Sequence, residues 1–379
     1  MTGAMSLAIE SAKRARETPC LFFDLDRMRL GARALQQIGG AHGVRFLSAV
    51  KALPTQDLLS AADSGGGFDV SNIGELRRLA DWHSGAALPY VSLTGPCLVS
   101  ADQRPTRFID RLAINLETEE QMGAVDSLAP WAHRIEIGVR IALRLYPGDP
   151  PPLTRFGLAS ADAIALMQHP DFTALHCHLE GDLRPTGSFV TAAHEMMALI
   201  ASAGRMPRMI NLGGGLRGET LQELEHICAD LRRIIPEEIE IVLEPGAWLT
   251  SAAGFALARV LWQRDMPGLD ATVVTLDLSR EIHLRWCTPE LIRWWGKPPS
   301  KGTALLFGPT CAESDHLGAF RVDAAAVTGA EHAEAWLLFG GVSGYAAAFN
   351  TEFNGIAPAK VVMVGAAVEA PAQEAVLHG

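Results

Sequence analysis

Eight short apolar segments alternate with stretches of helical spacing between residues 27 and 250. This alternation is the feature that most constrains the fold, because strands that alternate with helices build parallel sheets. Eight such units favour a closed (β/α)8 barrel over an open sheet. We therefore predict an α/β fold with a barrel over residues 27–250. The expected strands lie near 45–50, 67–71, 89–93, 111–115, 135–143, 173–178, 207–212 and 239–244, and the expected helices include 73–82, 119–128, 161–168, 188–203 and 219–235.

The pattern changes after residues 252–254, where strand-like runs follow one another with turns between them. This predicts a C-terminal antiparallel β domain over residues 251–379. The apolar alternation in residues 18–26 predicts a further strand that the N-terminus adds to this domain. The residues before it have the spacing of an amphipathic helix and lack the features of a signal peptide.

Composition excludes several classes of protein. The 379 residues carry a formal net charge of −11 with no basic run, which argues against a nucleic-acid partner. No apolar run reaches the length of a membrane span. The six cysteines are scattered without a CxxC pair, which predicts reduced thiols in a cytoplasmic protein. No metal site is expected.

Chemically distinctive residues follow the predicted strands. In barrels of this kind the active site forms where the strands end at their carboxyl side. Lys51 follows the first strand, Asp69 ends the second, His178 ends the sixth, Gly213–Gly215 follow the seventh and Glu244 follows the eighth. These side chains are therefore expected to lie around one cavity.

Each of these residues has a chemical and a plain interpretation. A partly desolvated lysine forms an imine readily, and successive glycines let backbone amides approach a phosphate. A buried carboxylate pairs with a protonated ring nitrogen, and an imidazole stacks on a flat ring. The plain alternatives are a solvated lysine, a tight turn, a helix cap and a core histidine. Together, however, the four features describe a site for pyridoxal 5′-phosphate.

A run of motifs carries a resemblance to a known family. The chain resembles the pyridoxal-phosphate decarboxylases of alanine-racemase-like fold, which include ornithine, diaminopimelate and carboxynorspermidine decarboxylases. The resemblance spans nearly the whole chain. The motifs, in family order, are TPCLFFDLDRMR, FLSAVKALP, GFDVSNIGEL, ALRLYPG, TRFGL, LHCHLEG, INLGGGL, EPG, FGPTCAESD and GYAAAFNTEFNG.

The resemblance implies roles for individual residues. Lys51 would form the imine with the cofactor. Cys311 would return a proton to the substrate carbon after carbon dioxide has left. Family members offer this cysteine from the partner subunit, so the resemblance implies a homodimer with shared active sites. The residues that would contact the cofactor are Lys51, Asp69, Arg144, His178, Gly213, Gly214, Gly215, Glu244 and Tyr345.

Substrate choice is where the chain departs from its relatives. Ornithine and diaminopimelate decarboxylases have an acidic residue directly after the catalytic cysteine, whereas this chain has Ala312. The usual arginine after EPG is Ala247. The segment LDLSREIHLRW most resembles the carboxynorspermidine branch but differs from it at HLRW. Residues expected at the substrate are Glu313, Asp315, His283 and Arg285, with Arg184, Arg217 and Arg285 as candidates for reading a distal carboxylate.

We therefore expect a decarboxylase for an amino acid or a carboxylated polyamine-like substrate, in polyamine, siderophore or other specialised metabolism. One alternative is an amino-acid racemase or epimerase on the same fold, which needs a base on each face of the ring. Another is a non-catalytic regulatory homologue, which is expected to lack Lys51 or Cys311. Both residues are present.

Overall fold

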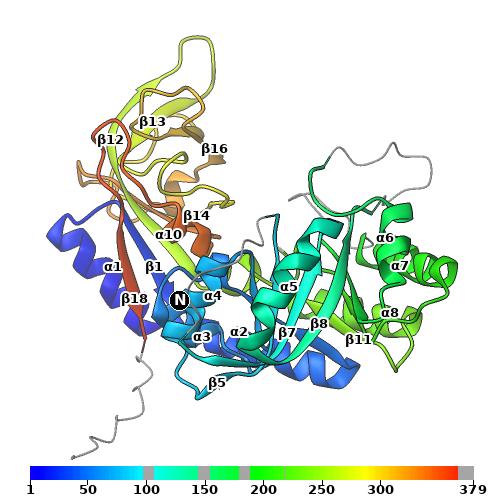
Figure 1. Ribbon diagram of the computed structural model, residues 1–379. Coiled ribbons are helices and arrows are strands. Elements are labelled where there is room, and N and C mark those ends of the chain that lie inside the picture. Colours follow the sequence, from blue (N-terminus) through cyan, green and yellow to red (C-terminus); the bar gives the residue numbers. More distant parts are fainter. Residues whose placement is uncertain (97–105, 144–153, 179–187, 217, 366–379) are drawn as a thin grey trace, which may run out of the picture. The chain divides into compact units, whose positions relative to one another are not determined.

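The computed structural model describes residues 1–96, 106–143, 154–178, 188–216 and 218–365 (Figure 1). The chain forms two compact units. The β unit comprises Met1–Met28, Ala52–Ala61 and Leu249–Ala367, and the barrel unit comprises Arg29–Lys51 and Ala62–Trp248. The predicted domains are a barrel over 27–250 and a β domain over 251–379 with the N-terminal strand 18–26; the β unit also takes in Ala52–Ala61.

The barrel unit is built on parallel strands at eight positions, linked through helices (Figure 1). The predicted (β/α)8 barrel is therefore confirmed. Its strands are β2 (Val44–Phe46) with β3 (Ser48–Ala49), β4 (Phe68–Val70), β6 (Val91–Thr94), β7 (Phe108–Leu116), β8 (Ala132–Ile141), β9 (Phe172–Cys177), β10 (Met209–Asn211) and β11 (Glu240–Leu243), and the short β5 (Ala87–Leu88) adds to β7.

The sheet closes at its first strand. β2 pairs with β11, whereas β3 pairs with β4. At the junction the Leu47 amide donates to the Leu243 carbonyl at 2.8 Å, and the Ser48 amide donates to the Gly67 carbonyl at 3.0 Å. One continuous segment thus changes its hydrogen-bonding partner from the last strand to the second, which removes the open edges of the sheet.

Helices connect the strands where the sequence spacing predicts them. Side chains fix several helix starts: Asn72 accepts from the Glu75 amide at α4, and Thr220 and Glu223 form a capping box at α8. Among the described residues, none of the helices is long and apolar enough to cross a membrane. The helices around the barrel are α2 (Leu25–His42), α4 (Ile73–Trp82), α5 (Met122–Leu128), α6 (Ser160–Met167), α7 (Ser188–Ala203) and α8 (Leu221–Ile234).

The barrel interior is layered, because every second residue of a strand points to the same face. A middle layer is apolar, and the next layer toward the carboxyl ends is polar. The middle layer consists of Leu47, Tyr90, Ala113, Ala174, Met209 and Val242. Two residues further along their strands, the upper layer contains Ser92, Asn115, His176, Asn211 and Glu244, all at most 3% exposed.

The β unit is a mixed sheet of eight strands, preceded by helix α1 (Gly3–Ala15). The prediction of an antiparallel domain holds for most pairs, but β13 pairs with β15 and β1 with β18 in parallel. The N-terminal β1 joins the sheet through β12, as predicted. The strands are β1 (Cys20–Asp24), β12 (Gly254–Asp265), β13 (Thr272–Leu276), β14 (Glu290–Trp295), β15 (Thr303–Phe307), β16 (His316–Arg321), β17 (Trp336–Gly340) and β18 (Lys360–Val364).

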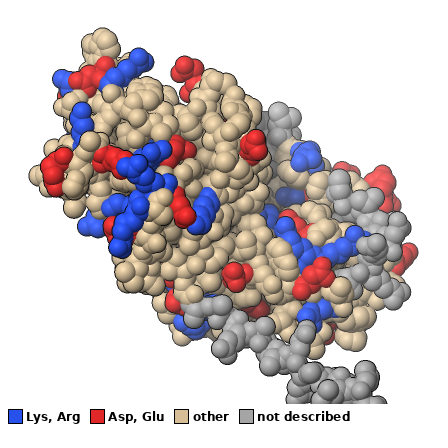
Figure 2. Space-filling view, turned by 90° about the vertical axis from the view of Figure 1, so that its left-hand side faces the viewer, with Lys and Arg blue, Asp and Glu red and all other residues tan. Residues whose placement is uncertain are grey.

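Charged side chains of both signs are interspersed on the face of the molecule seen in Figure 2. No extended area of Lys and Arg alone is visible there. This distribution matches the acidic sequence without basic runs.

Candidate active site

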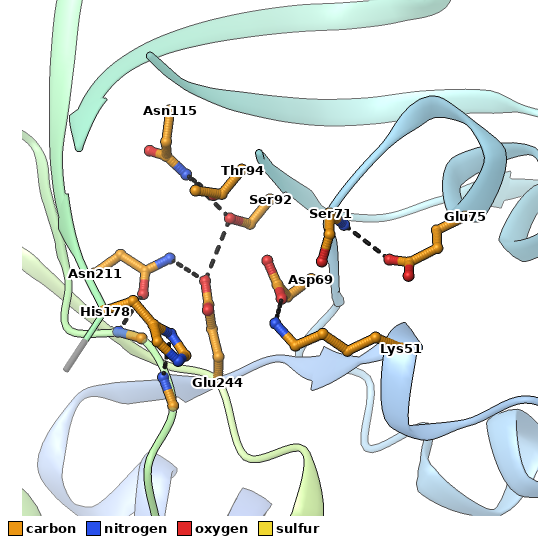
Figure 3. A network of polar contacts seen from close by, with 12 residues as sticks. Lys51, Asp69, Ser71, Glu75, Ser92, Thr94, Asn115, His178, Asn211 and Glu244 are labelled. Atoms are coloured by element: carbon orange, nitrogen blue, oxygen red, sulfur yellow. Dashed lines mark hydrogen bonds and ion pairs between the residues drawn. The ribbon is translucent and has the colours of Figure 1, made fainter. Parts of the chain in front are cut away.

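Lys51 and Asp69 meet at the carboxyl ends of neighbouring strands (Figure 3). Lys51 lies in a short 3-10 turn, Val50–Ala52, directly after β3. Its Nζ is 3.4 Å from Oδ2 of Asp69, whose side chain is only 2% exposed. Burial, together with the negative charge of Glu244, raises the pKa of Asp69 from its usual 3.8 to about 6, although the Lys51 charge opposes the shift. Its second oxygen, Oδ1, is buried without a hydrogen-bond partner.

Glu244 is buried and held by one of its two carboxylate oxygens (Figure 3). Oε1 accepts hydrogen bonds from Asn211 Nδ2 at 2.6 Å and from Ser92 Oγ at 3.4 Å, and it lies 3.6 Å from Nε2 of His176. Oε2 accepts no hydrogen bond from the described residues. Burial raises the pKa of Glu244, and the charge of Lys51 counteracts part of that rise. The carboxylate is therefore oriented, with one oxygen left for another group.

The glycines after β10 pack closely against neighbouring strand ends. A Cβ atom on Gly213 would lie 2.6 Å from the Cys177 carbonyl oxygen, and one on Gly214 would lie 2.8 Å from the Glu244 carbonyl oxygen. Gly213 also has a φ of 68°. The first two amides are engaged within the protein, since Gly213 N donates to Asn211 Oδ1 at 2.9 Å and Gly214 N to His178 Nδ1 at 3.3 Å. Side chains at these positions would clash, so this close approach requires glycine.

Two histidines of the LHCH segment lie in different surroundings. His178, the predicted stacking residue, follows β9 and contacts the glycine loop (Figure 3). His176, within β9, is 1% exposed, and neither ring nitrogen has a hydrogen-bond partner. Burial, supported by the charge of Arg140, lowers the pKa of His176 well below its usual value. His176 is therefore a neutral imidazole.

The arginine that the structure places in the upper layer is Arg140. It ion-pairs with Glu117 and lies over the Phe156 ring, with 4.7 Å between Cζ and the ring centroid. Its charge acts on both Glu244 and His176. The predicted Arg144 lies outside the described residues, as do Arg184 and Arg217.

In the β unit, the two loops that carry Cys311 and the FNG motif meet. The exposed Cys311 thiol lies 3.5 Å from Oδ1 of Asn354. Tyr345, the residue predicted to contact the phosphate, belongs to helix α10 (Gly344–Ala348) and packs edge-on against Trp286. Trp286 is 53% exposed and has a φ of 58°, an uncommon backbone conformation for a bulky residue.

Asp315 and His283, two of the residues predicted to bind the substrate, use their polar atoms in hydrogen bonds within the β unit. Both oxygens of the buried Asp315 accept two hydrogen bonds each, from Ser279 Oγ and the Arg280 amide and from the amide and hydroxyl of Thr310. The buried His283 accepts from the Ser279 amide and reaches the Ala357 carbonyl. Four hydrogen bonds fill a carboxylate, so the geometry favours a structural role for Asp315.

Glu313 and Arg285, the other two predicted substrate residues, are exposed. The Arg285 guanidinium lies over the Phe349 ring, with 5.4 Å between Cζ and the ring centroid. Both side chains are accessible to a ligand or to another chain.

The polar partners of Glu244 were not identified from the sequence. Ser92 and Asn211 bind its carboxylate, and Asn115 donates to Ser92 at 3.2 Å and to Thr94 at 2.8 Å. The sequence does contain a signal for them, because Ser92, Asn115 and Asn211 each stand two residues after a residue of the apolar middle layer. Small polar residues at period two inside apolar strands indicate a polar layer of the barrel.

The donor and acceptor set suits pyridoxal 5′-phosphate. An amine stands beside a carboxylate with one unpartnered oxygen, and a second, oriented carboxylate keeps one oxygen for a cationic ring nitrogen. Buried polar atoms normally find partners, so the unpartnered Oδ1 of Asp69 beside Lys51 indicates a polar ligand. The residues present therefore fit the cofactor.

Comparisons with known proteins agree with this geometry. Residues 27–251 match the model of the pyridoxal-dependent decarboxylase family, pyridoxal binding domain. A diaminopimelate decarboxylase of Pseudomonas fluorescens is 26% identical over 310 residues, covering 74% of this chain and 72% of that protein.

Solved structures share the fold over nearly the whole chain. Lysine/ornithine decarboxylase from Vibrio vulnificus, complexed with cadaverine, superposes with a TM-score of 0.70 at 18% identity, covering 96% of this chain and 99% of that one. A mutant diaminopimelate decarboxylase from Helicobacter pylori, complexed with L-lysine, gives 0.69 at 18% identity and covers 94% of each chain. With the match over its barrel, the chain belongs to the pyridoxal-dependent decarboxylases, carboxy-lyases that use pyridoxal 5′-phosphate.

Proposed function

We propose that this chain decarboxylates an α-amino acid, with Lys51 holding the cofactor and Cys311 returning the proton. The observation that carries the proposal is the trio of Lys51, Asp69 and Glu244 at adjoining strand ends of the barrel. When bound, pyridoxal 5′-phosphate supplies the electron sink that lets carbon dioxide leave. The protein supplies orientation and proton control.

The barrel residues bind and orient. The Lys51 amine would hold the cofactor through its aldehyde, and it donates a hydrogen bond to Oδ2 of Asp69. Glu244 would hold the ring nitrogen cationic through Oε2. His178 would cover one face of the ring. The glycine loop would bind the phosphate through its backbone amides.

The β unit supplies the proton donor. Cys311 is exposed, so its thiol is accessible to a second copy of the chain. We place Cys311 of one subunit at the Lys51 site of the other, with Tyr345 contributing to the phosphate site. The chain then works as a homodimer with shared sites. No disulfide joins the five described cysteines to one another, which supports a reducing compartment such as the cytoplasm.

A mixed-dimer experiment tests this arrangement. Lys51→Ala and Cys311→Ala chains are each expected to be inactive as homodimers. Random mixing makes half of the dimers hybrids, each with one site that retains both residues, so about a quarter of wild-type activity should return. If both residues served the same subunit, mixing would restore nothing.

The substrate is an amino acid with a polar distal group. Diaminopimelate is the first candidate, because the curated relatives carry that name. Ala312 and the filled Asp315 remove two acidic groups that could bind a distal amine, which leaves the exposed Glu313 and Arg285. Carboxylated polyamines and precursors of siderophores are the second class to test.

Release of carbon dioxide is the deciding assay. Amino acids with and without distal amines and carboxylates are incubated with the holoenzyme, and carbon dioxide and optical rotation are followed together. Carbon dioxide release with one preferred class supports the proposal. Loss of optical rotation without gas would instead identify a racemase.

A further inference from the structure

The upper layer of the barrel holds a buried cation and a buried acid that do not meet. Arg140 lies on β8 and Glu244 follows β11, and the strands β9 and β10 lie between them. Arg140 is 8% exposed and Glu244 is 3% exposed. In a low-dielectric interior opposite charges attract strongly, so the side chains that lie between these two are informative.

His176 and Asn211 occupy the intervening positions. Arg140 is in register with His176, and His176 is in register with Asn211. All three side chains therefore point to the same face of the sheet. Asn211 binds Oε1 of Glu244, and His176 stands 3.6 Å from the same oxygen. Two neutral polar groups thus screen the acid on the side that faces the guanidinium.

The charge of Arg140 has a partner on the side away from Glu244. Its Nη1 pairs with Oε1 of Glu117, which is 5% exposed, and its guanidinium lies over the Phe156 ring. A guanidinium has further donors, however, so Glu117 does not exhaust its capacity. A gap at His176 would allow Arg140 to turn toward Glu244.

We propose that His176 is a positioning residue, a neutral spacer that fills the space beside Oε1 of Glu244 and keeps the Arg140 guanidinium away, so that Oε2 stays available to a cationic ring nitrogen. The inference rests on the proposed role of Glu244 toward the cofactor. It explains why an imidazole with two unpartnered nitrogens is retained in the barrel interior. An ion pair between Arg140 and Glu244 would leave the ring nitrogen without its counter-charge.

Cofactor affinity in a set of variants tests the spacer role. His176→Ala is expected to weaken binding of pyridoxal 5′-phosphate about tenfold and to shift the absorption band of the bound cofactor, whereas His176→Gln, which keeps a neutral polar group, should stay within about threefold of wild type. Thermal unfolding of each cofactor-free variant monitors folding. Equal losses in the Ala and Gln variants would overturn the proposal.

A second background separates screening from simple packing. Glu117→Gln with Arg140→Met removes the cation and its partner together, so no buried charge is left unpaired. In this background His176→Ala should weaken cofactor binding no more than about twofold. The same tenfold loss would show that His176 acts by packing alone.

A crystal structure of the cofactor-free His176→Ala variant gives an answer that does not depend on the cofactor. The Arg140 guanidinium is expected within hydrogen-bond distance of Glu244. If it stays on Glu117 with Glu244 unchanged, the spacer inference is wrong even where the proposed function holds. Failure of wild-type protein to bind pyridoxal 5′-phosphate, in the same titration, would instead refute the proposed function.

Discussion

The two ends of the barrel interior are both charged, but only one of them is neutralised. At the amino end, Arg111 pairs with Glu136 at 2.8 Å and with Glu240 at 2.6 Å, and Arg45 also pairs with Glu240. At the carboxyl end, the Lys51 charge acts on both Asp69 and Glu244, and the charge of Glu244 adds to burial in raising the pKa of Asp69. The same strands therefore carry a closed ion-pair network at one end and an excess of acid at the other.

The pKa shifts of the two ends have opposite signs. Burial alone would raise the pKa of Glu240, but its bonds to Arg111 and the charge of Arg45 outweigh burial and lower it. Burial raises the pKa of Asp69 to about 6. Tyr90, between Arg45 and Arg111, forms part of the apolar layer that separates the ends. The amino end thus stabilises the fold, and the carboxyl end keeps unpaired groups for a ligand.

The largest expected effect is on activity, at Lys51. Lys51→Ala should reduce decarboxylation by roughly 10³-fold or more, because the covalent hold on the cofactor is lost. The urea midpoint of the cofactor-free protein should change little. Borohydride reduction followed by mass spectrometry measures the attached cofactor, and attachment in the variant at the wild-type level would contradict the role of Lys51.

The largest expected effect on stability is at Arg111. Arg111→Met should lower the free energy of unfolding by about 3 kcal/mol, because the buried Glu136 and the half-buried Glu240 lose their shared partner. The matched control is Arg134→Met, which removes a half-exposed partner of Glu136 and should cost less than about 1 kcal/mol. Urea unfolding measures both. Equal losses of unfolding free energy in the two variants would contradict the contrast between a buried network and a surface pair.

The pH dependence of stability should differ in sign between Asp69 and Glu240. The folded state binds the Asp69 proton more tightly than the unfolded state, so Asp69 lowers the free energy of unfolding as pH rises from about 4 to about 6, by about 3 kcal/mol at ~1.4 kcal/mol per pKa unit. The pKa of Glu240 is lowered in the folded protein. Glu240 therefore stabilises the folded state at pH values above its unfolded pKa, and this contribution is lost as the pH falls.

Urea midpoints of the cofactor-free protein between pH 4 and pH 7 test this difference, with Asp69→Asn and Glu240→Gln as the pair. The asparagine variant should gain stability relative to wild type as pH rises, and the glutamine variant should lose it. Parallel curves for the two variants would refute the contrast.

The smallest effects should separate Tyr90, directly before β6, from Ser92 within that strand. Tyr90→Phe removes a hydroxyl that lies 3.1 Å from the Met209 sulfur and should cost less than about 1 kcal/mol of stability, with cofactor affinity unchanged. Ser92→Ala removes a donor to Glu244 Oε1 and should weaken cofactor binding about threefold, with stability unchanged. Calorimetric titration with the cofactor and urea unfolding are run on both variants. A loss of cofactor affinity in Tyr90→Phe, or a loss of stability in Ser92→Ala, would contradict the prediction.

Much of the barrel was predictable from local patterns. Short apolar strands and amphipathic helices are set by periods of two and 3.6 residues, which a sequence displays directly. The chemistry of strand ends then brought Lys51, Asp69 and Glu244 to one edge, and the structure places them together. The parallel pairs β13–β15 and β1–β18 were not predicted, because strand direction in a sheet depends on long-range connections.

The sequence by itself determined the order of strands and helices and which residue types stand at strand ends, since both follow from local spacing. Only the tertiary structure decided how each polar group is satisfied. Asp315 is acidic in either view, but four hydrogen bonds fill it, two of them from Ser279 and Arg280 in another loop. Oε1 of Glu244 faces Asn211, Ser92 and His176, whereas Oε2 accepts no hydrogen bond from the described residues. Hydrogen-bond satisfaction depends on which strands become neighbours, and a linear pattern does not contain that information.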